Sequence, residues 1–451
     1  AGAAHYGPLS PADIWTRTAT EDFGGPGYHF VLAAWGALVG WTPFAARASS
    51  LLLGALALAW LYRLGRDMVS PLAGLGAVAL FGGSVFTVYF LHELRTYLLS
   101  VLLIAFVLWA YWRLAYTRRP GIALQAGFVL GVAGLLYTHY YLALILPVIG
   151  VYHVLFAPKQ PSPPAPPLPR QGEGSKRGYI RFPDKAWWRV VGLMAAGGVL
   201  FLPWVSVVLA ALSQFNTAES GAREPALSIV QLLERTALFF SSGAVWLLVI
   251  VLALALVSLR VYRRQSVAAW CWALLALAVL IVVNERTALI KPGRERYLLL
   301  VWPPLALLGG IGLATLSKTR GRFVIPIILA AWLVAGTQAA LDGALLRDTD
   351  GAQAVPWNVL ADTLREQAQP GEVAAVHLTA YNWVLDLRPL EYYLYGLPLR
   401  FTALESLPDH NFPQAARAFV EDAPAVWLAV DKRLPAGPRL NEFTAALAGQ
   451  Y

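Results

Sequence analysis

The chain has 451 residues, of which 58% are hydrophobic and only 14% are charged. This composition excludes an intrinsically disordered protein and differs from that of a soluble globular domain, in which about 25% of residues are charged. The formal net charge of +9 would indicate a nucleic-acid partner only if the basic residues formed one accessible patch. The single cysteine, Cys271, excludes an internal disulfide and a thiolate metal cluster, and its apolar surroundings predict a small buried hydrophobe.

Apolar runs long enough to cross a bilayer dominate the chain, which predicts a mainly α, polytopic transmembrane helical bundle. A shorter apolar stretch, residues 28–41, comes first, and we expect it to re-enter the membrane or to lie along its surface. The ten predicted spans are residues 44–62, 71–90, 97–115, 121–138, 140–157, 190–212, 236–258, 267–284, 297–317 and 323–341.

Lysine and arginine are distributed unequally between the predicted loops, which indicates the orientation in a cell (inner) membrane. The connections that follow the first, third, fifth, seventh and ninth spans together hold 18 basic and three acidic residues. These connections are predicted to be cytoplasmic. The opposite loops are neutral, and the tail after residue 341 has a net charge of −6. The positive charge therefore reflects membrane topology rather than nucleic-acid binding. Residues 1–43 and the tail are predicted to lie outside, so we expect another span to precede Ala1.

Two segments differ in composition from the spans. Residues 158–185 are rich in Pro, Gly, Ser and charged residues and predict a disordered cytoplasmic linker within the membrane domain, residues 1–341. Residues 342–451 predict a small extracytoplasmic α/β domain with helices in PWNVLADTLREQ and PQAARAFVEDA and strands in GEVAAVHL and AVWLAV. This domain either caps the outer vestibule or recognises an acceptor.

Four clusters of polar residues lie at the predicted outer ends of the spans, where ionisable groups are candidates for function. In the first cluster, Glu21 and Asp22 precede a Gly/Pro turn that leads into the apolar stretch. Carboxylates in this position can deprotonate an acceptor hydroxyl or hold a divalent metal ion. The alternative is a solvated acidic turn.

The second cluster, His92–Tyr97, joins two spans by only a few residues and therefore stays near the membrane. Glu93 and Tyr97 share one helix face if the turn is helical. Arg95 can either bind a phosphate with two hydrogen bonds or pair with Glu93 to order the turn.

The third cluster, Tyr137–Tyr141, is a tight outer turn that contains His139 and Tyr140. Aromatic residues at a membrane surface often form an interfacial belt, which is one interpretation. Stacking on a sugar or hydrogen bonding to a polar head group is the other.

The fourth cluster, Asn284–Tyr297, concentrates cations in an outer loop against the general charge trend: Arg286, Lys291, Arg294 and Arg296. A fixed anionic ligand accounts for such a loop, and phosphate or pyrophosphate fits it best. Contact with lipid head groups without catalysis is the alternative.

In this order, the clusters resemble the GT-C type membrane glycosyltransferases, especially the protein mannosyltransferases that use dolichyl-phosphate-mannose and the bacterial aminoarabinose transferases. The outer segment of that family, D-x-H-P-P-L-Y-Y followed by W…G and an arginine-small-leucine span start, resembles Asp22–His29, Trp35…Gly40 and Arg47-Ala-Ser-Ser-Leu. Gly24-Gly25 stands where the family has His-Pro. The principal catalytic Asp of the family, just after its first span, would precede residue 1.

Two further motifs carry the resemblance. The E-a-R-x-Y turn of the family is similar to Glu93–Tyr97, and its R-Y followed by a proline-containing span is similar to Arg296-Tyr297…Trp302-Pro-Pro. The resemblance covers residues 1 to about 341, and the tail is similar to an outer domain that some members carry.

The resemblance implies transfer of a sugar from a polyprenyl-phosphate donor to a lipid, glycan or protein acceptor on the outer face of the membrane. The implied catalytic or acceptor-side groups are Asp22, Glu21 and Glu93. The implied donor-phosphate ligands are Arg95, Lys291, Arg294 and Arg296. The residues expected to line the site are His92, Tyr97, His139, Tyr140 and Tyr297.

Three other functions fit the sequence less well. A lipid-linked-sugar flippase also needs outer cations, but it would more often carry mid-span charges and inverted repeats. An O-antigen ligase or polymerase would favour a larger outer loop than residues 213–235. A structural scaffold would not need the cation cluster at 284–297.

Overall fold

The computed structural model describes residues 10–22, 25–117, 119–156, 185–217, 226–291, 295–343, 357–377, 399–404, 407–408, 411–430 and 438–448. The chain divides into two compact units, one of which spans Leu9–Gln353 while the other contains Ala354–Tyr451. Each unit is described separately below. The predicted linker falls outside the described residues except for Lys185, which begins a helix.

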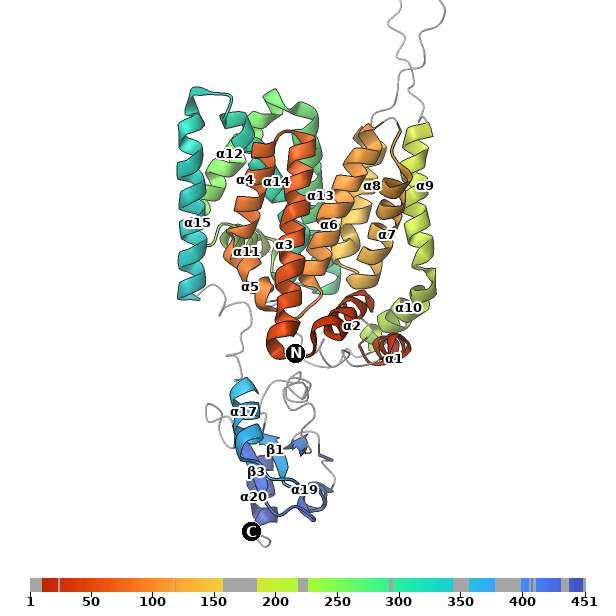
Figure 1. The fold of residues 1–451 in the computed structure, drawn as a ribbon, viewed down its shortest axis with the longest axis vertical. Coiled ribbons are helices and arrows are strands. Elements are labelled where there is room, and N and C mark those ends of the chain that lie inside the picture. The colour runs from red at the N-terminus through yellow and green to blue at the C-terminus, as the bar shows by residue number, and fades with distance from the viewer. Residues whose placement is uncertain are drawn as a thin grey trace, which may run out of the picture. The chain divides into compact units, whose positions relative to one another are not determined.

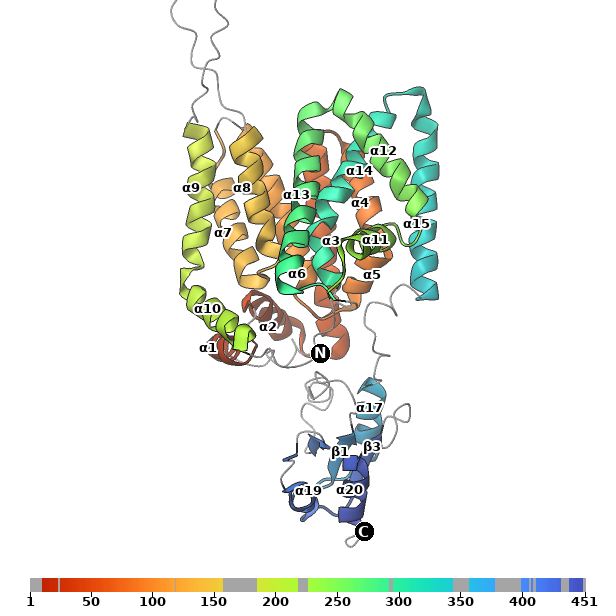
Figure 2. The ribbon, with the colours of Figure 1, turned by 180° about the vertical axis from the view of Figure 1, so that it is seen from behind.

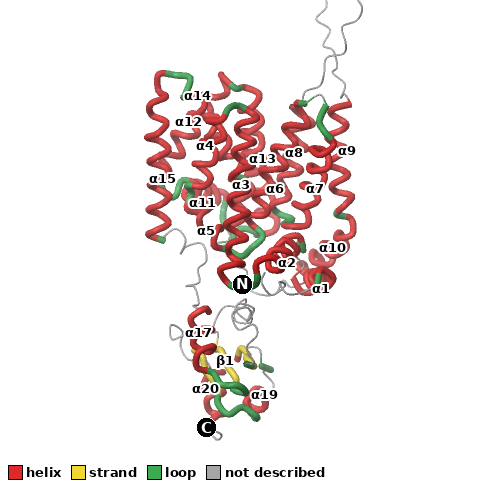
Figure 3. The backbone as a smooth tube through the Cα atoms, viewed as in Figure 1, coloured by secondary structure: helices red, strands yellow, loops and turns green. Residues whose placement is uncertain are grey.

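The first unit is a bundle of apolar helices (Figures 1 and 3). Its helices are α1 (Pro11–Arg17), η2 (Thr18–Asp22), α2 (Gly27–Val39), α3 (Pro43–Met68), α4 (Pro71–Gly82), α5 (Val85–His92), α6 (Tyr97–Tyr116), α7 (Ile122–Thr138), η3 (Leu142–Leu144), α8 (Ile145–Phe156), α9 (Lys185–Leu200), α10 (Leu202–Thr217), α11 (Ile229–Phe240), α12 (Val245–Val261), α13 (Arg263–Thr287), η4 (Glu295–Leu300), α14 (Trp302–Leu316), η5 (Arg320–Val324) and α15 (Ile325–Asp342).

Four helical segments are long and apolar enough to cross a membrane singly: Phe44–Met68, Tyr97–Tyr116, Arg263–Thr287 and Arg320–Asp342. Three bent helix pairs raise the number to seven, and shorter apolar helices coincide with the remaining predicted spans. The bundle therefore has the predicted class. The stretch predicted at 28–41 forms the short helix α2, and Cys271 is half-buried rather than buried.

The structure corrects three predicted spans, 71–90, 190–212 and 236–258, because each is bent. The angles are 68° between α4 and α5, 60° between α9 and α10, and 93° between α11 and α12. At the sharpest bend Ser242 and Gly243 both have positive φ, 55° and 85°. A hydropathy window cannot detect these breaks because the residues around them remain apolar.

At the breaks after α4 and after α11, a serine of each break bonds to a backbone group at the other. Ser84 Oγ donates a hydrogen bond to the carbonyl oxygen of Phe239 at 2.9 Å, and the amide of Val85 donates to Ser242 Oγ at 2.9 Å. The indole of Trp332 donates to the carbonyl oxygen of Leu80 at 3.0 Å. Interrupted helices are tolerated in a membrane when protein groups satisfy the freed backbone, and these three bonds do so.

Helix α14 lies in the middle of the bundle, against α4, α12 and α13. All of its residues from Trp302 to Thr315 are buried. A helix that is apolar on every side is typical of a core position, so protein surrounds α14, which has 15 residues and is about 22 Å long, up to its last residue, Leu316.

The two ends of the bundle differ in charge. The connections from α3 to α4, α6 to α7, α12 to α13 and α14 to α15 lie at one end (Figures 1 and 2). These connections carry the arginines and lysines predicted to face the cytoplasm. The turns after α5, α7 and α13 lie at the other end, together with α1, α2 and α10. The clusters singled out in the sequence therefore share one end.

The second unit is a small α/β fold. Its parallel sheet has the order β2-β1-β3 and consists of β1 (Val373–His377), β2 (Arg400–Ala403) and β3 (Val426–Val430). Helix α17 (Trp357–Gln367) packs on one face through Ala361 and Leu364, and α19 (Phe412–Val420) and α20 (Pro438–Leu447) pack on the other. The two predicted helices and two predicted strands are present, and β2 and α20 were not predicted.

Candidate functional site

Three turns bring an aromatic cluster together at the end of the bundle away from the basic connections. Tyr97 begins α6, His139 follows α7 and Tyr297 lies in η4. The ring of His139 lies 5.9 Å from that of Tyr97 and 5.8 Å from that of Tyr297, measured between centroids. Tyr141 joins the cluster, with its ring 5.2 Å from that of Tyr297. Residues from three distant parts of the sequence thus lie side by side, and their role as a site lining stays a prediction.

Arg296 places a positive charge against this cluster. Its guanidinium carbon lies 6.0 Å from the ring centroid of Tyr97 and 5.5 Å from that of Tyr297. Cation–π contact at this range orients the guanidinium group without consuming its hydrogen-bond donors. Arg296 is therefore held beside the aromatic side chains while its donors stay available for an anion.

His139 is the titratable group at the centre of the cluster. Burial, with a smaller contribution from the positive charge of Arg296, lowers the pKa of His139 from 6.5 to about 4, although a backbone hydrogen bond opposes the shift. Its Nδ1 atom is buried and has no hydrogen-bond partner among the described residues. A neutral imidazole at pH 7 can accept a hydrogen bond from a hydroxyl group of a ligand.

The turn with Glu93 and Arg95 is tied to a neighbouring helix. Ser50 Oγ, on α3, donates to the carbonyl oxygen of Glu93 at 2.8 Å. Glu93 has extended backbone angles and caps α5, so the turn is not helical and Glu93 and Tyr97 do not share a helix face. Glu93 and Arg95 nevertheless lie close enough to act electrostatically on Tyr97, as Arg296 also does. His92 is exposed at the end of α5.

The loop between α13 and η4 is anchored by Asn284, which is 2% exposed. The side-chain amide of Asn284 donates to the carbonyl oxygen of Leu227 at 2.8 Å, and its oxygen accepts from the amide of Ile290 at 2.7 Å. The amide of Leu227 donates to the carbonyl oxygen of Ile290 at 2.9 Å. Lys291 follows directly and is half-buried, whereas Arg294 falls outside the described residues.

Glu295 and Arg235 form an ion pair beside the cluster that the sequence pattern did not predict. Glu295 is 1% exposed, and its Oε1 lies 3.8 Å from Nη1 of Arg235 on α11. A buried carboxylate needs a compensating charge, so this pair connects α11 to the segment that bears Arg296. The one available signal was an acidic residue between two arginines in an apolar context.

The structure does not bring every predicted residue into the cluster. Tyr140 contributes to a separate aromatic group, because its hydroxyl accepts a hydrogen bond from the indole of Trp204 at 2.6 Å. The ring of Trp204 in turn lies 4.5 Å from that of Trp15. Glu21 and Asp22 end the π-helical turn η2, and their side chains fall outside the described part of the structure.

No group of three metal-ligating side chains occurs among the described residues. A divalent metal ion bound through Glu21 or Asp22 stays a prediction.

The sequence matches no protein-family model and no curated protein sequence. The fold, by contrast, is similar to solved structures. ArnT from Cupriavidus metallidurans, in the apo state, superimposes with a TM-score of 0.57 at 13% identity, over 95% of this chain and 84% of that protein. The same protein bound to undecaprenyl phosphate gives 0.56 at 13% identity, over 89% and 79%. The Archaeoglobus fulgidus oligosaccharyltransferase gives 0.50 at 14% identity, over 89% and 58%. The chain has the fold of the GT-C membrane glycosyltransferases.

Proposed function

We propose that this protein is an integral-membrane glycosyltransferase that moves a sugar from a polyprenyl-phosphate donor to an acceptor hydroxyl on the outer face of the cell membrane. The observation that carries the proposal is Arg296 held against Tyr97, His139 and Tyr297 at the bundle end opposite the basic connections. The binding of undecaprenyl phosphate by ArnT, which has the same fold, supports a lipid phosphate as part of the donor.

The cationic residues of the site suit the donor side of this reaction. A sugar–phosphate bond breaks with its electron pair going to the phosphate oxygen, so negative charge grows there in the transition state. Arg296 and Lys291, with Arg294 and Arg95, would stabilise that charge. The neutral ring of His139 and the hydroxyls of Tyr97 and Tyr297 would hydrogen-bond to the sugar.

The acidic residues suit the acceptor side. A carboxylate takes the proton of the acceptor hydroxyl as its oxygen attacks the anomeric carbon, which leaves neutral acid, glycosylated acceptor and polyprenyl phosphate. Glu93, Glu21 and Asp22 are the candidates. The α/β unit would lie on the same outer side and either recognise the acceptor or cap the site.

Activity of the full-length protein in membranes tests this assignment. Arg296→Ala and Glu93→Ala should each reduce transfer from a polyprenyl-phosphate sugar by about 100-fold or more, the scale of losing one group that stabilises transition-state charge. Both variants should retain wild-type amounts of folded protein. The exposed Arg320, at the opposite end of the bundle, gives a matched control, Arg320→Ala, with activity retained.

Retained transfer in both variants would overturn the site assignment. A second assay separates the enzyme from a flippase, because a flippase moves the lipid-linked sugar across vesicles without forming a glycosylated product. Translocation without product in wild-type protein would therefore refute the transferase proposal.

A further inference from the structure

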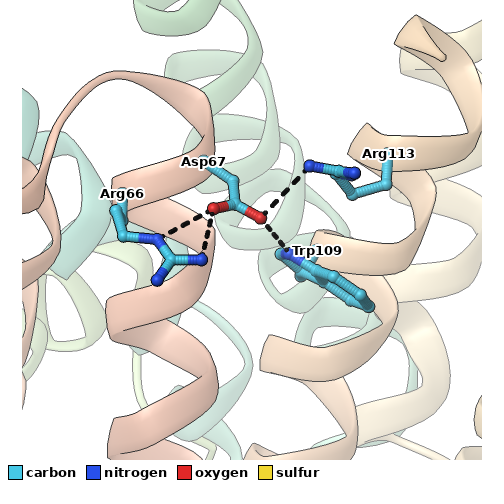
Figure 4. Close-up of polar contacts among 4 residues, drawn as sticks. All are labelled: Arg66, Asp67, Trp109 and Arg113. Atoms are coloured by element: carbon cyan, nitrogen blue, oxygen red, sulfur yellow. Dashed lines mark hydrogen bonds and ion pairs between the residues drawn. The ribbon is translucent and has the colours of Figure 1, made fainter.

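Asp67, near the end of α3, organises a group of basic side chains at the bundle end opposite the candidate site (Figure 4). Its Oδ1 accepts a hydrogen bond from Nε of Arg66 at 3.0 Å and forms an ion pair with Nη2 of the same residue at 2.9 Å. Its Oδ2 accepts from the indole of Trp109 at 2.9 Å and lies 3.6 Å from Nη1 of Arg113. The Asp67 side chain is 10% exposed, whereas those of Arg66 and Arg113 are 43% and 46% exposed. The carboxylate is thus covered while the two guanidinium groups face outward.

Arg63, one helical turn earlier, is held by aromatic rings instead of a carboxylate. Its guanidinium carbon lies 4.8 Å from the ring centroid of Trp109 and 5.3 Å from that of Trp60. No carboxylate among the described residues pairs with Arg63. Arg66 and Arg113 therefore share the single carboxylate of Asp67, and Arg63 contacts the same Trp109 that donates to it. The three guanidinium groups together carry more positive charge than one carboxylate balances.

An exposed apolar strip leads along α3 to Arg63. Leu52, Leu56, Trp60 and Arg63 follow one another at intervals of four, four and three residues, so they lie on one face of the helix. Leu52 is 45% exposed and Leu56 is 42% exposed. An apolar strip that ends at an oriented arginine matches a ligand with a hydrocarbon chain and an anionic head.

We propose that Arg63, Arg66 and Arg113 bind the phosphate of an anionic phospholipid whose acyl chain lies along Leu52 and Leu56. Arginine suits a phosphate because its planar group can donate two parallel hydrogen bonds. Asp67 and Trp109 hold the three cations in place before the lipid binds, which lowers the entropic cost of binding. The site is independent of the proposed transferase reaction, since it lies at the other end of the bundle.

Native mass spectrometry of the purified full chain, with phosphatidylglycerol or phosphatidylcholine added, tests the proposal. Wild-type protein should retain phosphatidylglycerol in preference to phosphatidylcholine. Arg63→Gln should weaken the retention of phosphatidylglycerol by about fivefold or more, the loss expected for one arginine at a membrane surface. Arg320→Gln removes the same charge from the same end of the bundle, where Arg320 is exposed, and should leave the retention unchanged.

Two further measurements keep the result interpretable. Arg63→Lys keeps the charge but loses the planar group, and we expect intermediate retention, which also guards against a loss caused by misfolding. Inorganic phosphate at millimolar concentration should not displace the lipid, because it lacks the acyl chain. Equal weakening in Arg63→Gln and Arg320→Gln would show a diffuse charge effect and overturn the site, as would displacement by inorganic phosphate.

Discussion

At the scale of single residues, the candidate site depends on side chains that are neighbours in sequence but face different surroundings. His139 lies in the ring cluster with Tyr97 and Tyr297, whereas the next residue, Tyr140, bonds to Trp204. The sequence shows that polar and aromatic residues gather in this turn. It cannot show which way each one points, because that depends on the turn geometry and on helices far away in the chain.

His139 should make the stability of the protein depend on pH. Its pKa is about 4 in the folded chain and about 6.5 when unfolded, so the unfolded state binds more protons between these values. Its contribution is therefore complete above pH 6.5 and falls as the pH drops towards 4, by about 3 kcal/mol in total. His139→Phe should flatten the dependence of the unfolding temperature on pH in this range. An unchanged profile would show that the imidazole is accessible to protons in the folded state.

Asn284 should be essential for the cation loop through its two side-chain hydrogen bonds. Asn284→Ala leaves the buried carbonyl oxygen of Leu227 and the amide of Ile290 without these partners, which should cost about 2 kcal/mol or more. Asn284→Asp keeps the acceptor for Ile290 but loses the donor. Chemical denaturation in detergent measures both changes. Thr287→Ala is a control because Thr287 is exposed and its hydroxyl donates to the carbonyl oxygen of Val283 within α13. A cost for Asn284→Ala no larger than that of the control would contradict this role.

At the scale of the elements, length and hydropathy predicted where most helices begin and end, but not where they bend. Ser84 and Ser242 are single polar residues in apolar surroundings. Each is important because its hydroxyl bonds to a backbone group of the segment that contains the other. A local pattern cannot reveal a hydrogen bond between residues 155 positions apart, such as that from Ser84 to Phe239. The same limitation applied to β2, which has only four residues and pairs with a strand earlier in the chain.

Removing the serine hydroxyls at the two breaks should destabilise the bundle. Ser84→Ala leaves the carbonyl oxygen of Phe239 without this donor, and Ser242→Ala leaves the amide of Val85 without this acceptor, at about 1–2 kcal/mol each. Ser100 is as buried as Ser84, but among the described residues its hydroxyl bonds only to the carbonyl oxygen of Thr96, which caps the same helix. Ser100→Ala should therefore be almost neutral. Equal unfolding temperatures for all three variants would refute a special role for the breaks.

At the scale of the whole molecule, the two units and the charge difference between the bundle ends were accessible from composition. The split near residue 353 falls 12 residues beyond the predicted domain boundary at 341.

The orientation of the chain can be measured by cysteine labelling. Cys271→Ser provides a cysteine-free background, since Cys271 is the sole cysteine. In that background, Glu421→Cys should react with a membrane-impermeant maleimide on intact cells, because the α/β unit is predicted to lie outside. Arg320→Cys should react only after permeabilisation. The reverse pattern would contradict the predicted topology and, with it, an outer-face reaction.

The paired breaks have a consequence for the biosynthesis of the protein. The segment that forms α4 and α5 enters the membrane well before α11 and α12 have been synthesised, so Ser242 is not yet there to accept the amide of Val85. Until then, the most stable form of the α4–α5 segment is one straight helix, because each backbone group then has its hydrogen-bond partner within the segment. We therefore expect the native bend to arise late, when the second broken helix arrives, and truncation of the nascent chain before residue 242 should trap the straight form.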